Sequence, residues 1–227
     1  MSTQVSTKPV ILRAHEVRSV LNGTQSQIRR IVKPQPDENG LSFMPNAPLD
    51  WRDDVHGEWH PWKGDTPNGD SWRGRVQCWP EDRLWVRESF MRVGWDAVQS
   101  TMDVRYRADD ERRTIAVPRS VDLVAQMKWK PSIHMPRWAS RITLEVTGVR
   151  VERLQDISEE DAIAEGVECW EERGYDDAQD FYRNYHTGGD LFTAKASYRT
   201  LWESINGPGS WERNDWVWVI EFKRIEP

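Results

Sequence analysis

The sequence predicts a small mixed α+β barrel that combines several short strands with two or three short helices. Apolar and polar residues alternate in runs at modest spacing, a few segments carry apolar residues at helical spacing, and stretches rich in Pro and Gly separate them. The 227 residues are enough to bury a core without disulfide or metal support. We interpret residues 1–227 as a single domain with two long insertions rich in polar and aromatic residues, at about 35–80 and 168–192.

Short strands and one helix are predicted for the first half of the chain. The helix carries apolar residues at i, i+3 and i+4 and meets Gly23 where a helix C-terminus is expected. Alternation of Leu84 and Val86 with Trp85 and Arg87 predicts a strand. The predicted elements of this half are a strand at 10–12, a helix at 14–22 and strands at 27–32, 82–90 and 103–107.

The insertion at about 35–80 is predicted to be ordered, since its tryptophans need a surface on which to pack. They are Trp51, Trp59, Trp62, Trp72 and Trp79. His56 and His60 are four residues apart in this insertion, but they lie in Pro/Gly-rich sequence rather than on a helix. We therefore predict no metal site there.

The second half begins with a fixed loop at 129–138, predicted from its two prolines. Ser158 is the predicted N-cap of a helix that carries Asp161 at its third position and ends at Gly166. The last strand is apolar on both faces in its first half, which predicts a central position in its sheet. The predicted elements are a strand at 141–151, helices at 158–166 and 194–205, and a strand at 216–224.

Charge and composition restrict the partners. The net charge is −6, with 31 basic and 37 acidic residues, whereas broad, sequence-independent duplex binding requires a strongly basic surface. Any nucleic acid is therefore expected to bind locally or as a single nucleotide. Most of the 14 tryptophans are expected to pack the core, and one or two to form a base-stacking platform.

Two cysteines, a polar N-terminus and the absence of a long apolar run predict a cytoplasmic protein without a membrane partner. The chain carries no Walker A motif and no dinucleotide-binding glycine pattern, and no cofactor is predicted. The oligomeric state is left open by the sequence.

Two charged positions leave alternatives open. Arg29 and Arg30 are neighbours on a predicted strand, so their side chains point to opposite faces, and the inward one needs an anionic partner. That partner is either a carboxylate of the fold or a ligand. Glu165 lies in the last turn of its predicted helix, where the helix dipole disfavours a carboxylate. It is therefore either exposed or held by a cationic or hydroxyl partner.

The stretch Gly-Thr-Gln-Ser-Gln-Ile-Arg-Arg at 23–30, followed by Ile-Val-Lys-Pro-Gln-Pro, resembles the signature of ASCH-domain proteins. It is most similar to the long ASCH proteins of tailed phages and prophages. The segments at 82–88, 129–141, 158–166 and 216–224 resemble that subfamily in order and spacing. The resemblance implies a PUA-like β-barrel and recognition of RNA or modified nucleosides.

The resemblance also implies a possible amidohydrolase site. Some small bacterial ASCH proteins remove the acetyl group from acetylcytidine with a Lys, a Thr and a Glu. Here the Lys position holds Gln25, the Thr position holds Ile28, and the helix carboxylate falls at Glu165. Ile28 has no hydroxyl and Gln25 cannot take a proton, so Glu165 is the one catalytic candidate, as a general base. Ser26 is a nearby hydroxyl.

Three functions follow from these residues. The leading hypothesis is a binding module for RNA, a nucleotide or a modified nucleoside, in which the Gln25 amide reads a base edge. Trp138 or Trp85 would stack on the ring and Arg137 would meet a phosphate. The alternatives are an amidohydrolase or ribonuclease with altered catalytic residues, and a phage protein that binds a host protein. The predicted ligand-binding residues are Gln25, Ser26, Arg30, Arg87, Arg137 and Trp138.

Overall fold

A computed structural model describes residues 6–33, 35, 78–118, 127–171 and 180–225. The chain divides into two compact units. Unit 1 comprises Met1–Gln25, Glu81–Val146 and Phe222–Pro227, and unit 2 comprises Ser26–Pro80 and Thr147–Glu221. The predictions made for Trp51, Trp59, Trp62, Trp72, His56 and His60 lie outside the described residues.

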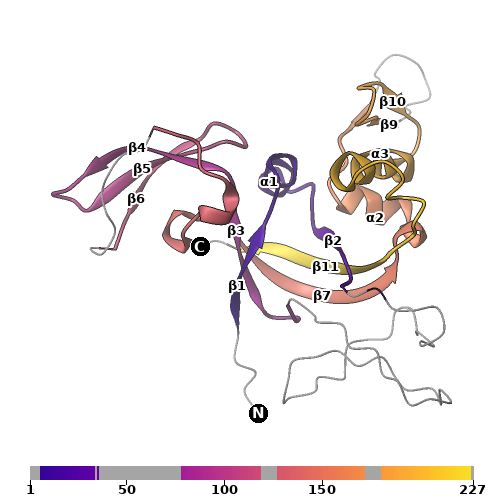
Figure 1. Cartoon of the computed structure of the whole chain (residues 1–227), viewed down its shortest axis with the longest axis horizontal. Coiled ribbons are helices and arrows are strands. Elements are labelled where there is room, and N and C mark those ends of the chain that lie inside the picture. The colour runs from indigo at the N-terminus through magenta and orange to yellow at the C-terminus, as the bar shows by residue number, and fades with distance from the viewer. Residues whose placement is uncertain (1–5, 34, 36–77, 119–126, 172–179, 226–227) are drawn as a thin grey trace, which may run out of the picture. The chain divides into compact units, whose positions relative to one another are not determined.

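The mixed α+β class is confirmed. The described residues form three α-helices and eleven strands, and the strands form one five-stranded and two three-stranded sheets (Figure 1). The strands β1 and β2 lie at the two edges of the larger sheet and do not pair with each other, so the described strands form no closed barrel. In spatial order, the larger sheet contains β1 (Thr7–Ile11), β3 (Arg83–Arg87), β7 (Thr143–Arg153), β11 (Trp216–Ile225) and β2 (Gln27–Ile31).

No helix among the described residues has the length and apolar content that crossing a membrane requires.

Unit 1 begins with β1, which pairs in parallel with β3, and with α1 (Ala14–Leu21). The helix buries Val17 and Val20, as its apolar spacing predicts. Gly23 adopts φ +77°, and its backbone N–H donates to the Val20 carbonyl at 3.2 Å. Only glycine takes this left-handed conformation without a steric penalty, so the predicted helix end is confirmed.

A three-stranded meander of β4 (Phe90–Asp96), β5 (Thr101–Tyr106) and β6 (Arg112–Ala116) also belongs to unit 1 (Figure 1). The prediction of a single strand at 82–90 is wrong at its C-terminal end, because β3 ends at Arg87 and a separate strand, β4, begins at Phe90. The 131–140 loop packs on the meander, where Met135 and Ala139 join its buried core. Two short 3-10 turns, Ser132–His134 and Arg137–Ala139, shape this loop, which agrees with the prediction of a fixed, non-regular segment.

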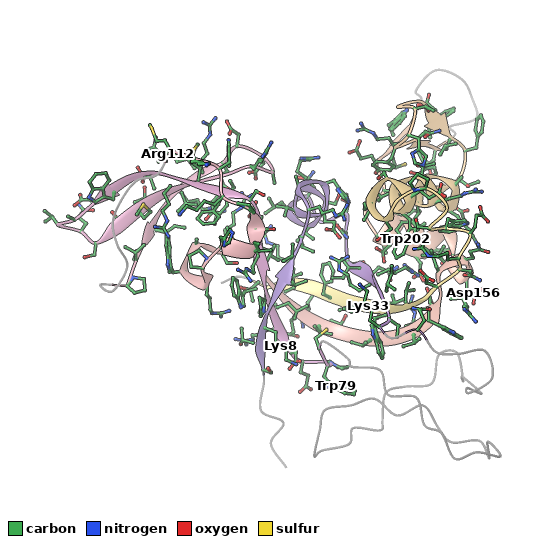
Figure 2. The ribbon with its side chains drawn as sticks, viewed as in Figure 1. Lys8, Lys33, Trp79, Arg112, Asp156 and Trp202 are labelled. Atoms are coloured by element: carbon green, nitrogen blue, oxygen red, sulfur yellow. The ribbon has the colours of Figure 1, made fainter. Side chains whose placement is uncertain are left out.

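Unit 2 places α2 (Glu159–Ala164) against α3 (Ala194–Asn206), and their apolar faces form its core with Val217 and Val219 of β11. Trp202 of α3 is buried in this core (Figure 2). The strand β11 lies between β7 and β2, which confirms its predicted central position. The second insertion contributes a small antiparallel sheet of β8 (Cys169–Glu171), β9 (Asp180–Arg183) and β10 (Asp190–Leu191).

The N-cap of α2 gives a first test. The Ser158 hydroxyl accepts a hydrogen bond from the Asp161 backbone N–H at 3.1 Å, as predicted. Replacing Ser158 with Ala removes that acceptor and is expected to lower the free energy of unfolding by about 1 kcal/mol. Ser158→Asn retains an acceptor and is expected to stay close to the wild type. Urea denaturation of the three proteins measures this; equal stability of the Ala variant would contradict the cap.

Candidate functional site

Arg29 is the inward-facing arginine of the pair on β2. Its side chain is 0% exposed, whereas Arg30 is only half-buried. The predicted need for an anionic partner is met by carboxylates of the fold. Three of them, from β7, from α2 and from the end of α2, bind Arg29 directly; they are Glu152, Asp161 and Glu165.

Glu165 is held at both oxygens by Arg29. The Arg29 guanidinium donates to Glu165 Oε1 at 2.8 Å, and the Arg29 backbone N–H donates to Oε2 at 3.2 Å. The Glu165 residue is 6% exposed, so the alternative of a carboxylate held by a cation is confirmed and the exposed alternative is wrong. The pairing overcomes the unfavourable position at the helix C-terminus.

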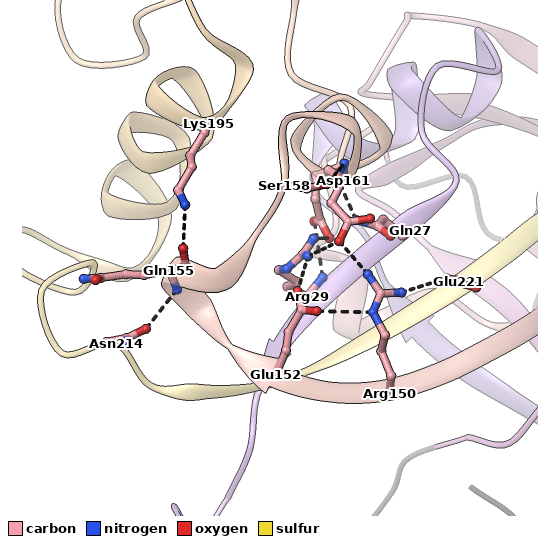
Figure 3. A network of polar contacts seen from close by, with 11 residues as sticks. Gln27, Arg29, Arg150, Glu152, Gln155, Ser158, Asp161, Lys195, Asn214 and Glu221 are labelled. Atoms are coloured by element: carbon pink, nitrogen blue, oxygen red, sulfur yellow. Dashed lines mark hydrogen bonds and ion pairs between the residues drawn. The ribbon is translucent and has the colours of Figure 1, made fainter. Parts of the chain in front are cut away.

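A second arginine, Arg150, extends this cluster (Figure 3). Its guanidinium donates to Glu152 at 3.2 Å and to Asp161 at 2.5 Å, and it also pairs with Glu221. Arg29 and Arg150 thus share Glu152 and Asp161. We call the six residues Arg29, Arg150, Glu152, Asp161, Glu165 and Glu221 the Arg29 network.

The Arg29 network contains more negative than positive charge. Two arginines face four carboxylates, a formal charge of 2 − 4 = −2. Burial acts to raise the pKa of Asp161, but the guanidinium groups of Arg150 and Arg29 outweigh it and lower that pKa below its ordinary value. The pKa of Arg29 is raised, because Glu165, Tyr198 and Glu152 outweigh the opposing effect of burial. An anionic ligand would therefore meet an excess of negative charge in this network.

Arg141 forms a similar closed cluster in unit 1. Its guanidinium binds Glu88 at 2.8 and 2.9 Å and Asp109 at 2.7 and 3.0 Å, and it also pairs with Glu111. It lies 4.1 Å from the ring centroid of Tyr106. Burial raises the pKa of Glu88, although Arg141 opposes that shift. This cluster ties the end of the 131–140 loop to the β5–β6 turn, and we assign it a structural role.

Two arginines that lie near an aromatic ring rather than near carboxylates are found beside Trp85 of β3. The guanidinium carbons of Arg87 and Arg137 lie 5.5 and 6.0 Å from the centroid of the Trp85 ring. Arg87 donates to the Ile133 carbonyl, and its buried Nε atom has no hydrogen-bond acceptor in the described part of the chain. Within the described ranges neither arginine pairs with a carboxylate. We call Trp85, Arg87 and Arg137 the Trp85 cluster.

The predicted site residues fall into both units. Arg87 and Arg137 meet at Trp85, and Trp138 follows in the same loop with its ring 5.5 Å from the Arg92 guanidinium carbon. Gln25 is buried at the end of unit 1, where its backbone N–H donates to the Ser19 carbonyl at 3.2 Å. The remaining predicted site residues belong to unit 2 and are Ser26, Arg30 and Glu165.

Sequence reasoning missed several of the charged residues that organise the two units. Arg150 and Glu152 are two apart on β7, and this i, i+2 pairing of opposite charges on one strand face was a usable signal. Arg141 carried no comparable local signal, since its partners come from distant turns.

Comparison of the chain with protein-family models, curated protein sequences and solved structures found no match.

Among the residues that the structure describes, no three His, Cys, Asp or Glu side chains are grouped so that they could hold a metal ion.

Replacing Arg29 with Met is expected to lower the free energy of unfolding by about 3–5 kcal/mol, because it leaves buried carboxylates without their cation. Arg199 on α3 is a matched control, since its pair with Glu212 is exposed. Arg199→Met is expected to cost about 0–1 kcal/mol. Urea denaturation measures both; similar losses for the two variants would show that the Arg29 network does not stabilise unit 2.

The lowered pKa of Asp161 predicts a pH dependence. A carboxyl group whose folded-state pKa is depressed adds stability above its unfolded pKa of about 3.9, and this is lost as the pH falls through the folded value. Asp161→Asn is therefore expected to be less stable than the wild type at pH 7, and the gap should narrow below about pH 4. Exposed Asp156 in the same unit provides the control Asp156→Asn (Figure 2). A gap that is constant with pH contradicts the assignment.

Proposed function

We propose that this chain is a PUA-like module of the ASCH type that binds RNA or a nucleotide, including a modified one. The Trp85 cluster carries the proposal, because it joins an aromatic ring to two arginines that the sequence had marked as ligand-binding. The barrel fold, the phage or prophage origin and action in the cytoplasm of a bacterial host are parts of the same proposal. They rest on the resemblance of residues 23–36 to the ASCH signature.

The Trp85 cluster suits a nucleotide for a physical reason. Single-stranded RNA and nucleotides are recognised by stacking of bases on aromatic rings or guanidinium planes and by cationic contacts to phosphates. A guanidinium above a tryptophan ring keeps its charge while its plane is restrained by the ring. Arg137 is exposed, so its remaining donors can reach a ligand.

Binding is favoured over amide hydrolysis. Hydrolysis by the ASCH amidohydrolase route needs a nucleophile and an activating base, and neither Gln25 nor Ile28 supplies one. Both oxygens of Glu165 accept hydrogen bonds from Arg29, which leaves the carboxylate less available to a water molecule. The other predicted contacts, from Gln25, Ser26 and Arg30, stay predictions.

The binding test uses a labelled single-stranded RNA and an exposed arginine. Arg137→Ala is expected to weaken binding about tenfold or more, since a hydrogen bond to a charged group contributes roughly 1.5–3 kcal/mol. Trp85→Leu is expected to weaken binding by about 1–3 kcal/mol through the lost stack. Arg83 is exposed on the same strand as Trp85 and gives the control Arg83→Ala. Fluorescence anisotropy at fixed salt provides the measurement.

Two results would overturn the proposal. Equal weakening by Arg83→Ala and Arg137→Ala would mean that nonspecific charge, rather than the Trp85 cluster, binds the RNA. Turnover of acetylcytidine that Glu165→Ala abolishes would replace the binding-only function with an amidohydrolase.

A further inference from the structure

Arg92 of β4 and Lys130 lie close together on the meander of unit 1. The backbones of Lys130 and Phe90 pair with each other. The Lys130 N–H donates to the Phe90 carbonyl at 2.8 Å, and the Phe90 N–H donates to the Lys130 carbonyl at 3.2 Å. Arg92 follows Phe90 by two residues and therefore projects from the same face of β4. Lys130 and Arg92 are thus diagonal neighbours on one face of the sheet. At this spacing two long side chains can reach each other.

The two side chains bring like charges together. Burial and the nearby charge of Arg92 lower the pKa of Lys130 below its ordinary value. The Arg92 Nε atom is buried and has no hydrogen-bond acceptor among the residues that the structure describes. In the described part of the chain neither side chain pairs with a carboxylate. This contrasts with Arg141 in the same unit, which binds three carboxylates.

Trp138 supplies an aromatic wall beside these cations. Its ring lies 5.5 Å from the Arg92 guanidinium carbon and packs against the meander core. Trp138 follows Arg137 directly in the Arg137–Ala139 turn, so one turn contributes to both this group and the Trp85 cluster.

We propose that Arg92 and Lys130, beside Trp138, form a phosphate-binding subsite that is separate from the Trp85 cluster. Two cations held together without an anion from the described residues leave a place that a phosphate group fills, relieving their repulsion. The guanidinium offers a planar fork to phosphate oxygens and the ammonium adds a point charge. In its natural setting the subsite takes a backbone phosphate of a single-stranded nucleic acid whose base binds at Trp85, and this source rests on the proposed function.

The experiment measures the accessibility of Lys130 and the salt dependence of binding. Mild acylation followed by peptide mass spectrometry reports the reactivity of Lys130, with exposed Lys128 as an internal reference. The probes are inorganic pyrophosphate alone and a single-stranded RNA. Both are expected to slow acylation of Lys130 relative to Lys128, and Arg92→Met is expected to weaken that protection.

Binding of the RNA by Lys130→Met and Lys128→Met provides the second readout. For a single strand, each lost phosphate contact reduces the slope of log K against log salt by roughly 0.7. Lys130→Met is expected to show this reduction, and Lys128→Met, which removes the same charge two residues away, is expected to keep the wild-type slope.

The outcomes separate the subsite from the proposed function. RNA binding that depends on Arg137, with unchanged salt slope and unprotected Lys130, would overturn the subsite and leave the proposed function standing. Protection of Lys130 by pyrophosphate without any RNA binding would support the subsite as a site for free phosphates and overturn the proposed function. If neither probe protects Lys130, the subsite is wrong.

Discussion

Unit 2 depends on one fully buried guanidinium, that of Arg29. A charge without solvent must be neutralised and hydrogen-bonded by the fold itself, so the elements around β2 are placed by that requirement. Glu152 comes from β7 and Asp161 from α2, while Glu165 follows α2, and all three converge on Arg29. The Ser158 cap sets the start of α2 and thereby fixes where Asp161 points. The short helix α2 is thus positioned both by these ion pairs and by the packing of Ala162 in the core of unit 2.

Six of the arginines that the structure describes fall into two groups according to their partners. Arg29, Arg150 and Arg141 are enclosed by carboxylates, although the buried Nε atom of Arg29 has no hydrogen-bond partner among the described residues. Arg87, Arg92 and Arg137 instead lie over tryptophan rings, without a carboxylate partner in the part of the chain that the structure describes. A desolvated arginine that is already bound to carboxylates gains little from an anionic ligand. An arginine that lies over a ring keeps its hydrogen-bond donors and its charge for binding an anion. The candidate site therefore lies at the tryptophans rather than at the deeper ion pairs.

Local signals in the sequence predicted the elements but not the long-range ion pairs. The helix end at Gly23, the Ser158 cap and the apolar spacing of α1 each depend on neighbouring residues, and all were predicted correctly. The inward arginine of β2 could not be chosen by alternation, because Gln27, Ile28 and Arg29 are all buried. The end of β3 was missed for a related reason: Glu88 leaves the strand pattern to meet Arg141, 53 residues away. Of the candidate site, the sequence marked Arg87, Arg137 and Trp138, but their grouping at tryptophan rings required tertiary structure.

The placement of carboxylates explains how an acidic chain can bind a phosphate. The net charge is −6, yet seven carboxylates lie within the Arg29 network and the Arg141 cluster, four in the first and three in the second. The two clusters hold three arginines and seven carboxylates, a formal charge of 3 − 7 = −4, so most of the net negative charge lies in them, and it is screened beyond a Debye length of about 8 Å at physiological salt. The positive groups at Trp85 and Trp138 then act over a short range only. In the proposed function, such a surface would attract duplexes only weakly at long range and would select a ligand whose phosphate and base enter these clusters together.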